Sequence, residues 1–288
     1  MRSLLRVLRT GPLALLQDDG RPGQAAVGVG RSGAADRAAY ALANRLVANP
    51  PGLAAIETTL GGLELEVRGA GVLVCLTGAP APLHVDGVAV GDHAPIVVPA
   101  GSRLRVDPPV AGLRSYLAVR GGIDVPPVLG SRSHDVLSGL GPPPLAEGDL
   151  LRVGPAPREQ PSVDQAPPPR YDEPAVLRVV RGPRADRVVD ADALVDTTWT
   201  ASDRSNRIGM RLTGGRVAPV AGAGELVSEG VWRGAVQVPP NGEPVVFLSD
   251  HPVTGGYPVV GVVLGADVDR AAQVRPGQQE RFRWVGAP

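Results

Sequence analysis

Lysine is missing from this chain of 288 residues, and arginine supplies all 29 basic side chains. The absence excludes mechanisms that need a lysine amine, including a P-loop lysine on nucleotide phosphates, a Schiff base, and covalently attached biotin or lipoate. If biotin takes part in the chemistry, another chain must therefore carry it. Any ATP must be bound without a Walker lysine.

Cysteine, histidine and aromatic residues are also scarce. The single Cys75 excludes an intrachain disulfide and a cysteine-only metal site, and the apolar run 72–76 around it predicts a buried, inert thiol. The four histidines do not pair at metal-ligand spacing, so no metal site is expected. His84 and His93 are expected at the surface. Because aromatic residues make up only 3% of the chain, its cores must be built from Val, Leu, Ala and Ile.

The charge pattern gives no sign of a nucleic-acid or membrane partner. Net charge is zero, and no basic stripe is interleaved with aromatic residues. No apolar run approaches the ~20 residues of a membrane-spanning helix. The run 13–16 is too short for a signal peptide, and acidic residues follow it. We therefore expect a cytoplasmic protein that binds neither nucleic acid nor membrane.

Glycine and proline are abundant, with 38 and 31 residues. The segment 154–174 is the clearest boundary, because it is rich in proline, poor in apolar residues and without periodicity. The chain length favours two domains. We predict an N-terminal domain at 1–154, a Pro-rich linker at 155–174 and a C-terminal domain at 175–288.

One convincing helix is predicted, at residues 34–48, where Ala, Leu and Arg recur at helical spacing. Ser32 or Gly33 is expected to cap it, and Asn49, followed by two prolines, is expected to end it. A second, short helix is expected at 191–195.

Most other apolar runs are short and bounded by turn residues, as in β-strands. Asp86-Gly87 and Asn241-Gly242 predict the tips of two hairpins, because these pairs favour the primed turns that join antiparallel strands. Further strands are expected at 63–67, 72–76, 103–106, 113–119, 176–180, 259–264 and 281–285. Many short strands with Gly/Pro turns indicate a mainly β fold of sandwiches or barrels.

Residues 28–33 match the dinucleotide fingerprint G-x-G-x-x-G at the start of the predicted helix. The preceding residues 24–29 make a poor buried strand, and no strand–helix alternation follows elsewhere. In a chain with 38 glycines the pattern is easily met by chance. We interpret it as a glycine-rich turn before a helix.

Short polar and glycine-rich motifs recur along nearly the whole chain. In the first half they are residues 16–23 (LQDDGRPG), 28–36 (GVGRSGAAD), 43–47 (ANRLV), 55–62 (AIETTLGG), 76–79 (LTGA) and 114–131 (RSYLAVRGGIDVPPVLGS). In the second half they are residues 205–209 (SNRIG), 228–230 (SEG), 234–239 (GAVQVP) and 254–258 (TGGYP). As an ordered set, they resemble the allophanate hydrolase subunit 2 family, also called the 5-oxoprolinase C subunit or biotin-dependent carboxyltransferase-like family.

The resemblance implies two cyclophilin-like β-barrel domains with few short helices. It implies the C subunit of an ATP-dependent 5-oxoprolinase, which hydrolyses the cyclic amide 5-oxoproline to L-glutamate together with A and B subunits. Two alternatives stay open: the carboxyltransferase half-module of a biotin-dependent urea carboxylase/allophanate hydrolase system, and a non-catalytic antagonist of a kinase inhibitor. ATP is expected to be shared with or bound by the partner subunits, and biotin only if another chain carries it.

The chain departs from the family pattern in three places. Asp19 stands where a small or apolar residue is common, and Val253 replaces the first Thr of a usual Thr-Thr-Gly-Gly-Tyr-Pro. Residues 139–146 form a shortened, proline-rich version of a glycine-rich loop. These departures leave the substrate open among small amides and ureido compounds.

Both enzymatic chemistries act on a planar amide or ureido group whose oxygen gains negative charge, so the site needs hydrogen-bond donors and a carboxylate. The matched motifs supply both kinds of group. The predicted catalytic residues are Asp18, Asp36, Glu57 and Arg207. The predicted substrate-binding residues are Arg21, Asn44, Arg204, Asn206, Gln237, Thr254, Gly255, Gly256 and Tyr257.

Structural roles would explain the same residue types. Asp18 and Arg21 could pin a turn through an ion pair, and Asp36 could serve the helix dipole. Glu57 lies in an apolar context, where a buried carboxylate must be paired. Tyr257 could belong to a core, with its hydroxyl bonded to backbone.

The candidate residues lie in five segments that are far apart in the sequence: 17–23, 28–36, 57–62, 204–209 and 254–257. Each segment mixes glycine with polar residues, a composition typical of ligand-facing loops. We predict that at least three of them converge on one concave surface that crosses the boundary between the halves and adjoins the face that receives the B subunit.

Overall fold

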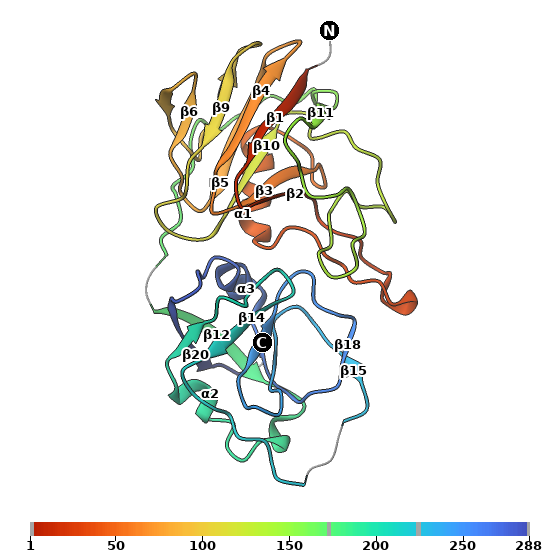
Figure 1. Ribbon diagram of the computed structural model, residues 1–288, viewed down its shortest axis with the longest axis vertical. Coiled ribbons are helices and arrows are strands. Elements are labelled where there is room, and N and C mark those ends of the chain that lie inside the picture. Colours follow the sequence, from red (N-terminus) through yellow and green to blue (C-terminus); the bar gives the residue numbers. More distant parts are fainter. Residues whose placement is uncertain (1–2, 172–173, 223–225, 287–288) are drawn as a thin grey trace. The chain divides into compact units, whose positions relative to one another are not determined.

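The computed structural model describes residues 3–171, 174–222 and 226–286. Within these residues the chain forms twenty strands, three short α-helices and two 3₁₀ helices (Figure 1). The mainly β fold expected from the turn-rich sequence is therefore confirmed.

The chain divides into two compact units, but not at a single point of the sequence. Unit 1 comprises Met1–Arg21, Ser32–Asp135 and Gly139–Arg170. Unit 2 comprises Pro22–Arg31, Val136–Ser138 and Tyr171–Pro288, so two short loops of the first half group with the second. The predicted linker spans the change of unit after Arg170, and its residues 172–173 lie outside the described part of the chain.

Unit 1 contains two antiparallel sheets (Figure 1). The six-stranded sheet has the order β11-β1-β4-β9-β6-β7, and the five-stranded sheet has the order β2-β3-β10-β5-β8. Their bounds are β1 Leu4–Thr10, β2 Leu13–Gln17, β3 Ala55–Thr59, β4 Leu63–Arg68, β5 Val72–Gly78, β6 Leu83–Val85, β7 Val88–Val90, β8 Ile96–Val98, β9 Arg103–Val106, β10 Arg114–Val119 and β11 Leu150–Arg152.

The main core of unit 1 lies between these sheets. Strand β4 alternates buried Leu63, Leu65 and Val67 with more exposed glutamates, as a strand with one face on a core requires. The same apolar cluster includes Leu76 of β5 and Leu117 of β10, from the other sheet. The predicted hairpin joins β6 to β7, and Asp86 and Gly87 have φ of 50° and 81° at its tip.

Helix α1 spans Arg37–Leu46 and is the longest helix among the described residues. The predicted caps Ser32 and Gly33 are wrong, because Asp36 caps the helix by accepting a hydrogen bond from the Ala39 amide at 2.9 Å. Ser32 and Gly33 instead have positive φ, so the chain turns there before the helix begins.

The buried face of α1 packs on strands β5 and β10. Tyr40 and Ala43 of the helix share a cluster with Cys75 and Tyr116. Cys75 is fully buried, and burial, with a smaller effect of the Asp92 charge, raises the pKa of its thiol to about 12. The expected buried position of the thiol is confirmed, and the raised pKa disfavours its reactive thiolate form.

Unit 2 is built on a closed barrel in the order β12-β19-β16-β17-β14-β13-β20. All its pairs are antiparallel except β12 with β20. The bounds are β12 Ala175–Arg181, β13 Trp199–Ala201, β14 Gly209–Thr213, β16 Ala235–Gln237, β17 Val245–Phe247, β19 Val259–Val263 and β20 Gln279–Trp284. The core fills the interior with Val, Leu and Ala around Trp199 and Phe282.

Shorter elements complete unit 2. The second predicted hairpin joins β16 to β17, with Gly242 at φ 78°. Strands β15 (Glu229–Gly230) and β18 (Thr254–Gly255) form a separate two-stranded sheet. The helices are α2 Ala193–Asp196, close to the predicted second helix, α3 Gly265–Ala271, η1 Ala25–Val27 and η2 Ala185–Arg187.

Residues 25–27 form a 3₁₀ helix without buried residues, so no strand directly precedes the G-x-G-x-x-G motif, and the glycine-rich turn is the correct interpretation.

The surface position expected for His93 is wrong, because its side chain is 1% exposed. Its amide donates to the Leu76 carbonyl at 2.7 Å, and its carbonyl accepts from the Ala166 amide at 2.9 Å, so residues before and after it in the chain hold it inside.

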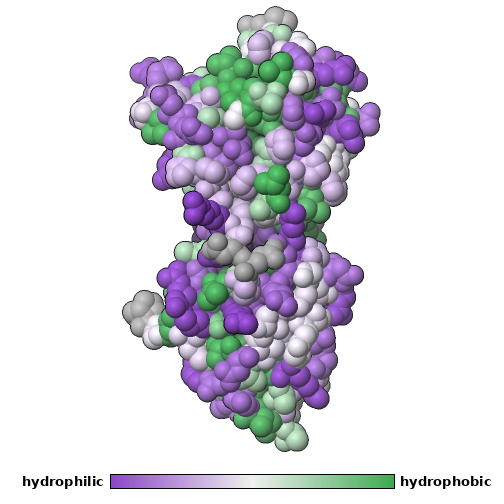
Figure 2. Space-filling model, turned by 90° about the vertical axis from the view of Figure 1, so that its left-hand side faces the viewer, coloured by the Kyte–Doolittle hydropathy of each residue, from purple (hydrophilic) through white to green (hydrophobic). Residues whose placement is uncertain are grey.

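Hydrophobic residues on the face drawn in Figure 2 form separate patches among hydrophilic ones. No helix in the described part of the chain is long and apolar enough to cross a membrane.

Candidate functional site

Asp18, which follows directly after β2, is the centre of a buried hydrogen-bond network in unit 1. Its Oδ1 accepts from the Ser131 and Ser133 hydroxyls, both at 2.6 Å, and from the Gly20 amide at 2.8 Å. Its Oδ2 accepts from the Arg132 amide at 2.6 Å. Four donors therefore hold the carboxylate, and Asp18 ties the loop after β2 to residues 131–133.

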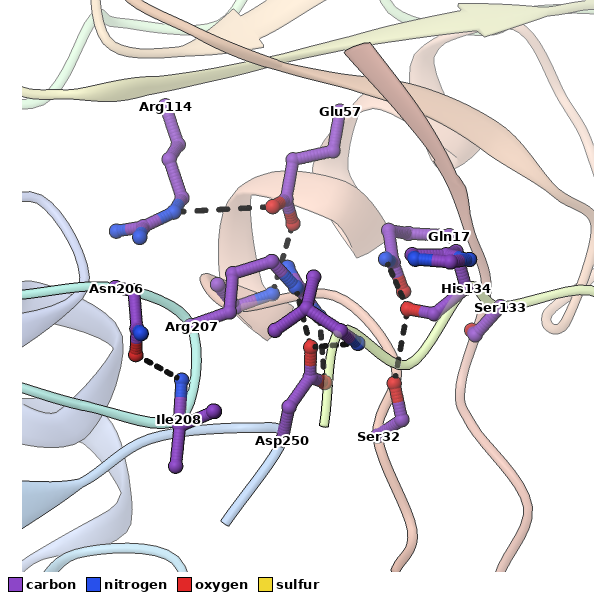
Figure 3. A network of polar contacts seen from close by, with 12 residues as sticks. Gln17, Ser32, Glu57, Arg114, Ser133, His134, Asn206, Arg207, Ile208 and Asp250 are labelled. Atoms are coloured by element: carbon purple, nitrogen blue, oxygen red, sulfur yellow. Dashed lines mark hydrogen bonds and ion pairs between the residues drawn. The ribbon is translucent and has the colours of Figure 1, made fainter. Parts of the chain in front are cut away.

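Arg21 lies beside this network and is 1% exposed. Its Nη2 donates to the Ser133 carbonyl, and its Nε is 3.5 Å from the Val128 carbonyl oxygen. The suggested ion pair between Asp18 and Arg21 is therefore wrong: each binds the 128–133 loop instead. Gln17 and Ser32 bind the same region, since both donate to the His134 carbonyl, at 2.8 and 3.2 Å (Figure 3).

A second network joins the start of α1 to strands β3 and β10. The Oε2 of Glu57 accepts from the Tyr116 hydroxyl at 2.9 Å and from the Ala35 amide at 3.0 Å. The Tyr116 oxygen in turn accepts from the Asp36 amide at 2.7 Å. The predicted residues Asp36 and Glu57 are thus brought together, with Tyr116 between them.

The charges and the burial of this network keep the phenol proton on Tyr116. Burial, helped by the Glu57 and Asp36 carboxylates, raises the pKa of Tyr116 well above its ordinary value. The phenol therefore stays protonated at neutral pH and donates to Glu57. Arg114 balances the charge, with its Nε 3.7 Å from Oε1 of Glu57 (Figure 3).

Asn44, on the buried face of α1, serves the backbone around it. Its Nδ2 is 3.2 Å from the Leu53 carbonyl, and its Oδ1 accepts from Asn49 at 2.8 Å. Asn49 also donates to the Val119 carbonyl at 2.8 Å. These bonds attach the end of the helix to the sheet, and the described contacts of Asn44 are all structural.

In unit 2 a buried ion pair joins Arg207 to Asp250. The guanidinium donates Nε and Nη2 to the two carboxylate oxygens at 2.8 and 3.0 Å, and both side chains are at most 2% exposed. The Asp250 amide also donates to the Arg207 carbonyl at 3.0 Å, and Asp250 accepts from the Val136 amide at 3.0 Å. Two parallel bonds make this a bidentate pair that fixes the orientation of Arg207.

The neighbours of Arg207 in the sequence are more exposed. Asn206 shapes the turn before β14 by accepting from the Ile208 and Gly209 amides at 2.8 and 3.3 Å (Figure 3). Arg204 lies 3.4 Å from Glu243, with 61% of its side chain exposed. A solvated role for Arg204 therefore agrees with its position better than a buried one.

Gln237 and the residues 254–257 are brought together in unit 2. The buried Gln237 amide donates to the Tyr257 carbonyl at 3.0 Å. A Cβ on Gly255 would lie 2.6 Å from Gln237 Nε2, so a larger residue there would have to displace the end of the Gln237 side chain. Tyr257 is 48% exposed, which makes its suggested core position wrong. Tyr257 and Gly256 line a cavity of 660 Å³.

The two units thus carry distinct sets of polar groups. In unit 1, the segments 17–21, 32–36 and 57 come together, because the Ala34 amide also donates to the Asp18 carbonyl at 3.0 Å. In unit 2, Gln237 joins residues 254–257, and Arg207 pairs with Asp250. The described residues contain no group of three or more His, Cys, Asp or Glu that could hold a metal ion. The catalytic and binding roles assigned from the sequence stay predictions.

Several residues of these networks were not singled out from the sequence. Ser131 and Ser133 hold Asp18 from more than 110 positions away, and Tyr116 and Asp250 complete the Glu57 and Arg207 pairs. Tyr116 and Ser131 lie in the matched run 114–131, which is the only sequence signal for them. Nothing local marked Asp250.

The sequence from residue 27 to residue 284 matches the family described as carboxyltransferase domain, subdomain A and B. The chain belongs to this family, and the resemblance found in its motifs is confirmed.

Named relatives fall into two groups. The chain is 37% identical to the 5-oxoprolinase C subunit of Escherichia coli (strain K12), over 97% of its own length and 90% of that protein's. It is 31% identical to the urea amidolyase of Saccharomyces cerevisiae, over 96% of its length but only 16% of that protein's. The crystal structure of the Kluyveromyces lactis urea carboxylase superimposes with a TM-score of 0.92 at 28% identity, over 99% of this chain and 28% of that one.

Proposed function

We propose that this chain is the C subunit of an ATP-dependent 5-oxoprolinase-type complex, which hydrolyses 5-oxoproline to L-glutamate together with A and B subunits. The observation that carries the proposal is the match to the 5-oxoprolinase C subunit, which spans nearly the full length of both proteins. In the urea-processing relatives, by contrast, the matching region is a small part of a much longer chain.

The composition of the chain supports different roles for the subunits of such a complex. A chain without lysine cannot hold ATP phosphates through a Walker lysine, so we assign ATP binding to the partner subunits. This chain would contribute polar groups that orient the cyclic amide, such as the Glu57–Tyr116 pair with its retained proton. We place the complex in the cytoplasm, where ATP is available.

A second candidate is a carboxyltransferase half-module that acts on urea. The fold similarity to urea carboxylase favours it. In that case a biotin carried by another chain would deliver the carboxyl group, because this chain has no lysine to which biotin could be attached.

Co-expression with the A and B subunits of a 5-oxoprolinase from the same organism distinguishes the two candidates. The purified assembly should release ADP when 5-oxoproline is supplied and should not consume urea. ATP-dependent consumption of urea, with none of 5-oxoproline, would establish the second candidate instead.

A further inference from the structure

Residues 155–170, which we call the strap, continue from β11 as part of unit 1 without forming a helix or a strand (Figure 1). Most of their side chains are exposed, and only Pro157, Pro161 and Ala166 are half-buried. The prolines have a fixed φ, so the strap loses less conformational entropy when it docks than an ordinary segment of the same length.

Arg120, directly after β10, holds the first part of the strap. Its Nη2 donates to the Pro157 carbonyl at 2.9 Å and also to the Glu159 carbonyl. Its Nη1 donates to the carbonyl of Val47, the C-cap of α1, at 3.0 Å. A cation is favourable at this end of a helix. One guanidinium therefore joins the strap to the end of α1, and it does so through backbone carbonyls alone.

The strap has a second attachment at Ala166. The Ala166 amide donates to the His93 carbonyl at 2.9 Å, and its side chain packs against the apolar cluster shared by α1, β5 and β10. Arg120 and His93 supply every hydrogen bond that the described residues make to the strap. A segment that is attached at two points and otherwise solvated opens at a lower free-energy cost than the sheets beneath it.

The strap also leads toward unit 2, whose first strand, β12, begins at Ala175. While the strap is docked, its last attachment to unit 1 is at Ala166. Once it is released, the last attachment is at Gly154, whose amide donates to the Gly122 carbonyl at 3.0 Å. Release therefore roughly doubles the length of chain between the last attachment on unit 1 and the first strand of unit 2.

We propose that the strap opens and closes while the sheets of unit 1 stay folded, and that Arg120 sets how often it opens. Closed, it covers the cluster beside Ala166 and keeps the connection to unit 2 short. Open, it uncovers that side of α1 and β5 and lengthens the connection.

Trypsin detects the open state, because the strap contains Arg158 between the two carbonyls that Arg120 holds. In the full-length chain, cleavage after Arg158 should be about tenfold or more slower than in a synthetic peptide of residues 154–171, since a docked segment must open before a protease binds it. Arg120→Gln should speed this cleavage about tenfold or more, because the hydrogen bonds of the guanidinium are lost. Arg152→Gln, which changes an exposed arginine of β11, is the matched control and should leave the rate unchanged.

A change within the strap separates its release from a loss of folding. Ala166→Pro removes the amide that donates to His93 and alters no contact among the strands and helix of unit 1. It should speed cleavage after Arg158 about threefold or more, because one of the two attachments is lost. Ala166→Ser keeps the amide donor and should cleave as the wild type does.

Amide hydrogen exchange of wild type and Arg120→Gln tests whether the strap opens by itself. The Ala166 amide should exchange faster in Arg120→Gln, whereas the amides of β10 should keep their wild-type protection.

Three results would overturn the proposal. Cleavage after Arg158 as fast in the wild type as in the free peptide would show that the strap is not docked. Equal cleavage rates in wild type and Arg120→Gln would show that Arg120 does not hold it. A loss of protection in β10 that accompanies the loss at Ala166 would show that the strap opens only together with the sheets.

Discussion

Glu280 is a fully buried carboxyl group inside the barrel of unit 2, and neither of its oxygens has a hydrogen-bond partner among the described residues. It lies on the inward face of β20 with Phe282, opposite Ala175 of β12 and Trp199 of β13. Burial raises its pKa from 4.5 to about 8. The side chain is therefore protonated at neutral pH, and ionising it inside the barrel is unfavourable.

The pH dependence of stability follows from this shift. Between pH 4.5 and about 8 the unfolded chain releases the Glu280 proton while the folded chain keeps it, so stability falls as pH rises through this window. We predict that Glu280→Gln removes this slope, with a relative gain on the order of a few kcal/mol at pH 8 compared with pH 5. Thermal unfolding of both proteins across this range measures it.

Glu147→Gln changes the same charge at an exposed position and should leave the slope as in the wild type. Parallel pH curves for wild type and Glu280→Gln would show that the Glu280 carboxyl is not held protonated.

The carboxylate of Asp18 gives a second prediction. Its two oxygens accept four hydrogen bonds, so the side chain acts only as an acceptor. In Asp18→Asn an amide N–H₂ would face one or more of these donors. The cost should be about 1–3 kcal/mol of stability, the range for leaving a buried polar group unsatisfied. Denaturant unfolding measures the loss, with Asp124→Asn as an exposed control in the same unit. An Asp18→Asn protein as stable as the wild type but inactive would favour the catalytic role predicted from the sequence over the structural one.

The residue types of these networks were predictable, but their partners were not. Carboxylates such as Asp18 and Glu57 stand out in glycine-rich or apolar motifs, whereas the serines and tyrosine that bind them lie 59 or more positions away. Hydrogen bonds over such separations depend on strand order and register. A single sequence does not contain that information in any local pattern.

The elements themselves were easier to predict from the sequence. Asp86-Gly87 and Asn241-Gly242 marked hairpin tips because their backbone conformations are needed for the turn whatever surrounds it. The ends of helix α1 were less predictable. Asp36 caps the helix, although Ser32 and Gly33 are equally plausible by type, because the positive φ at these two residues delays its start.

The side chain of Gln237 in β16 lies against Gly255 of β18 and donates to the Tyr257 carbonyl. Gly255→Ala should push the Gln237 amide away from the Tyr257 carbonyl and cost about 1–3 kcal/mol. Gln237→Ala should cost a similar amount. The double variant should cost less than the sum, by about 0.5 kcal/mol or more, because the second change makes room for the first. Denaturant unfolding of the four proteins completes the cycle, and strict additivity would contradict the proposed contact.

At the scale of the molecule, composition predicted the mainly β class, and the ordered motifs predicted the family. The grouping of the chain into units was harder to foresee, since residues 22–31 and 136–138 belong with unit 2. Both loops are short and lie inside the first half, so no change of composition marks them. The domain limits drawn at 154 and 175 stay a prediction about folding units.

We predict that activity belongs to the assembled complex and not to this chain alone. The chain has no lysine to bind ATP phosphates, so it should not hydrolyse a lactam by itself. The most direct measurement is ATP-dependent release of L-glutamate from 5-oxoproline by the A, B and C subunits, combined and with each omitted in turn. We predict turnover only for the full set, and none for this chain by itself. Unchanged turnover without this chain, or glutamate release by this chain alone, would contradict its assignment as an obligatory C subunit.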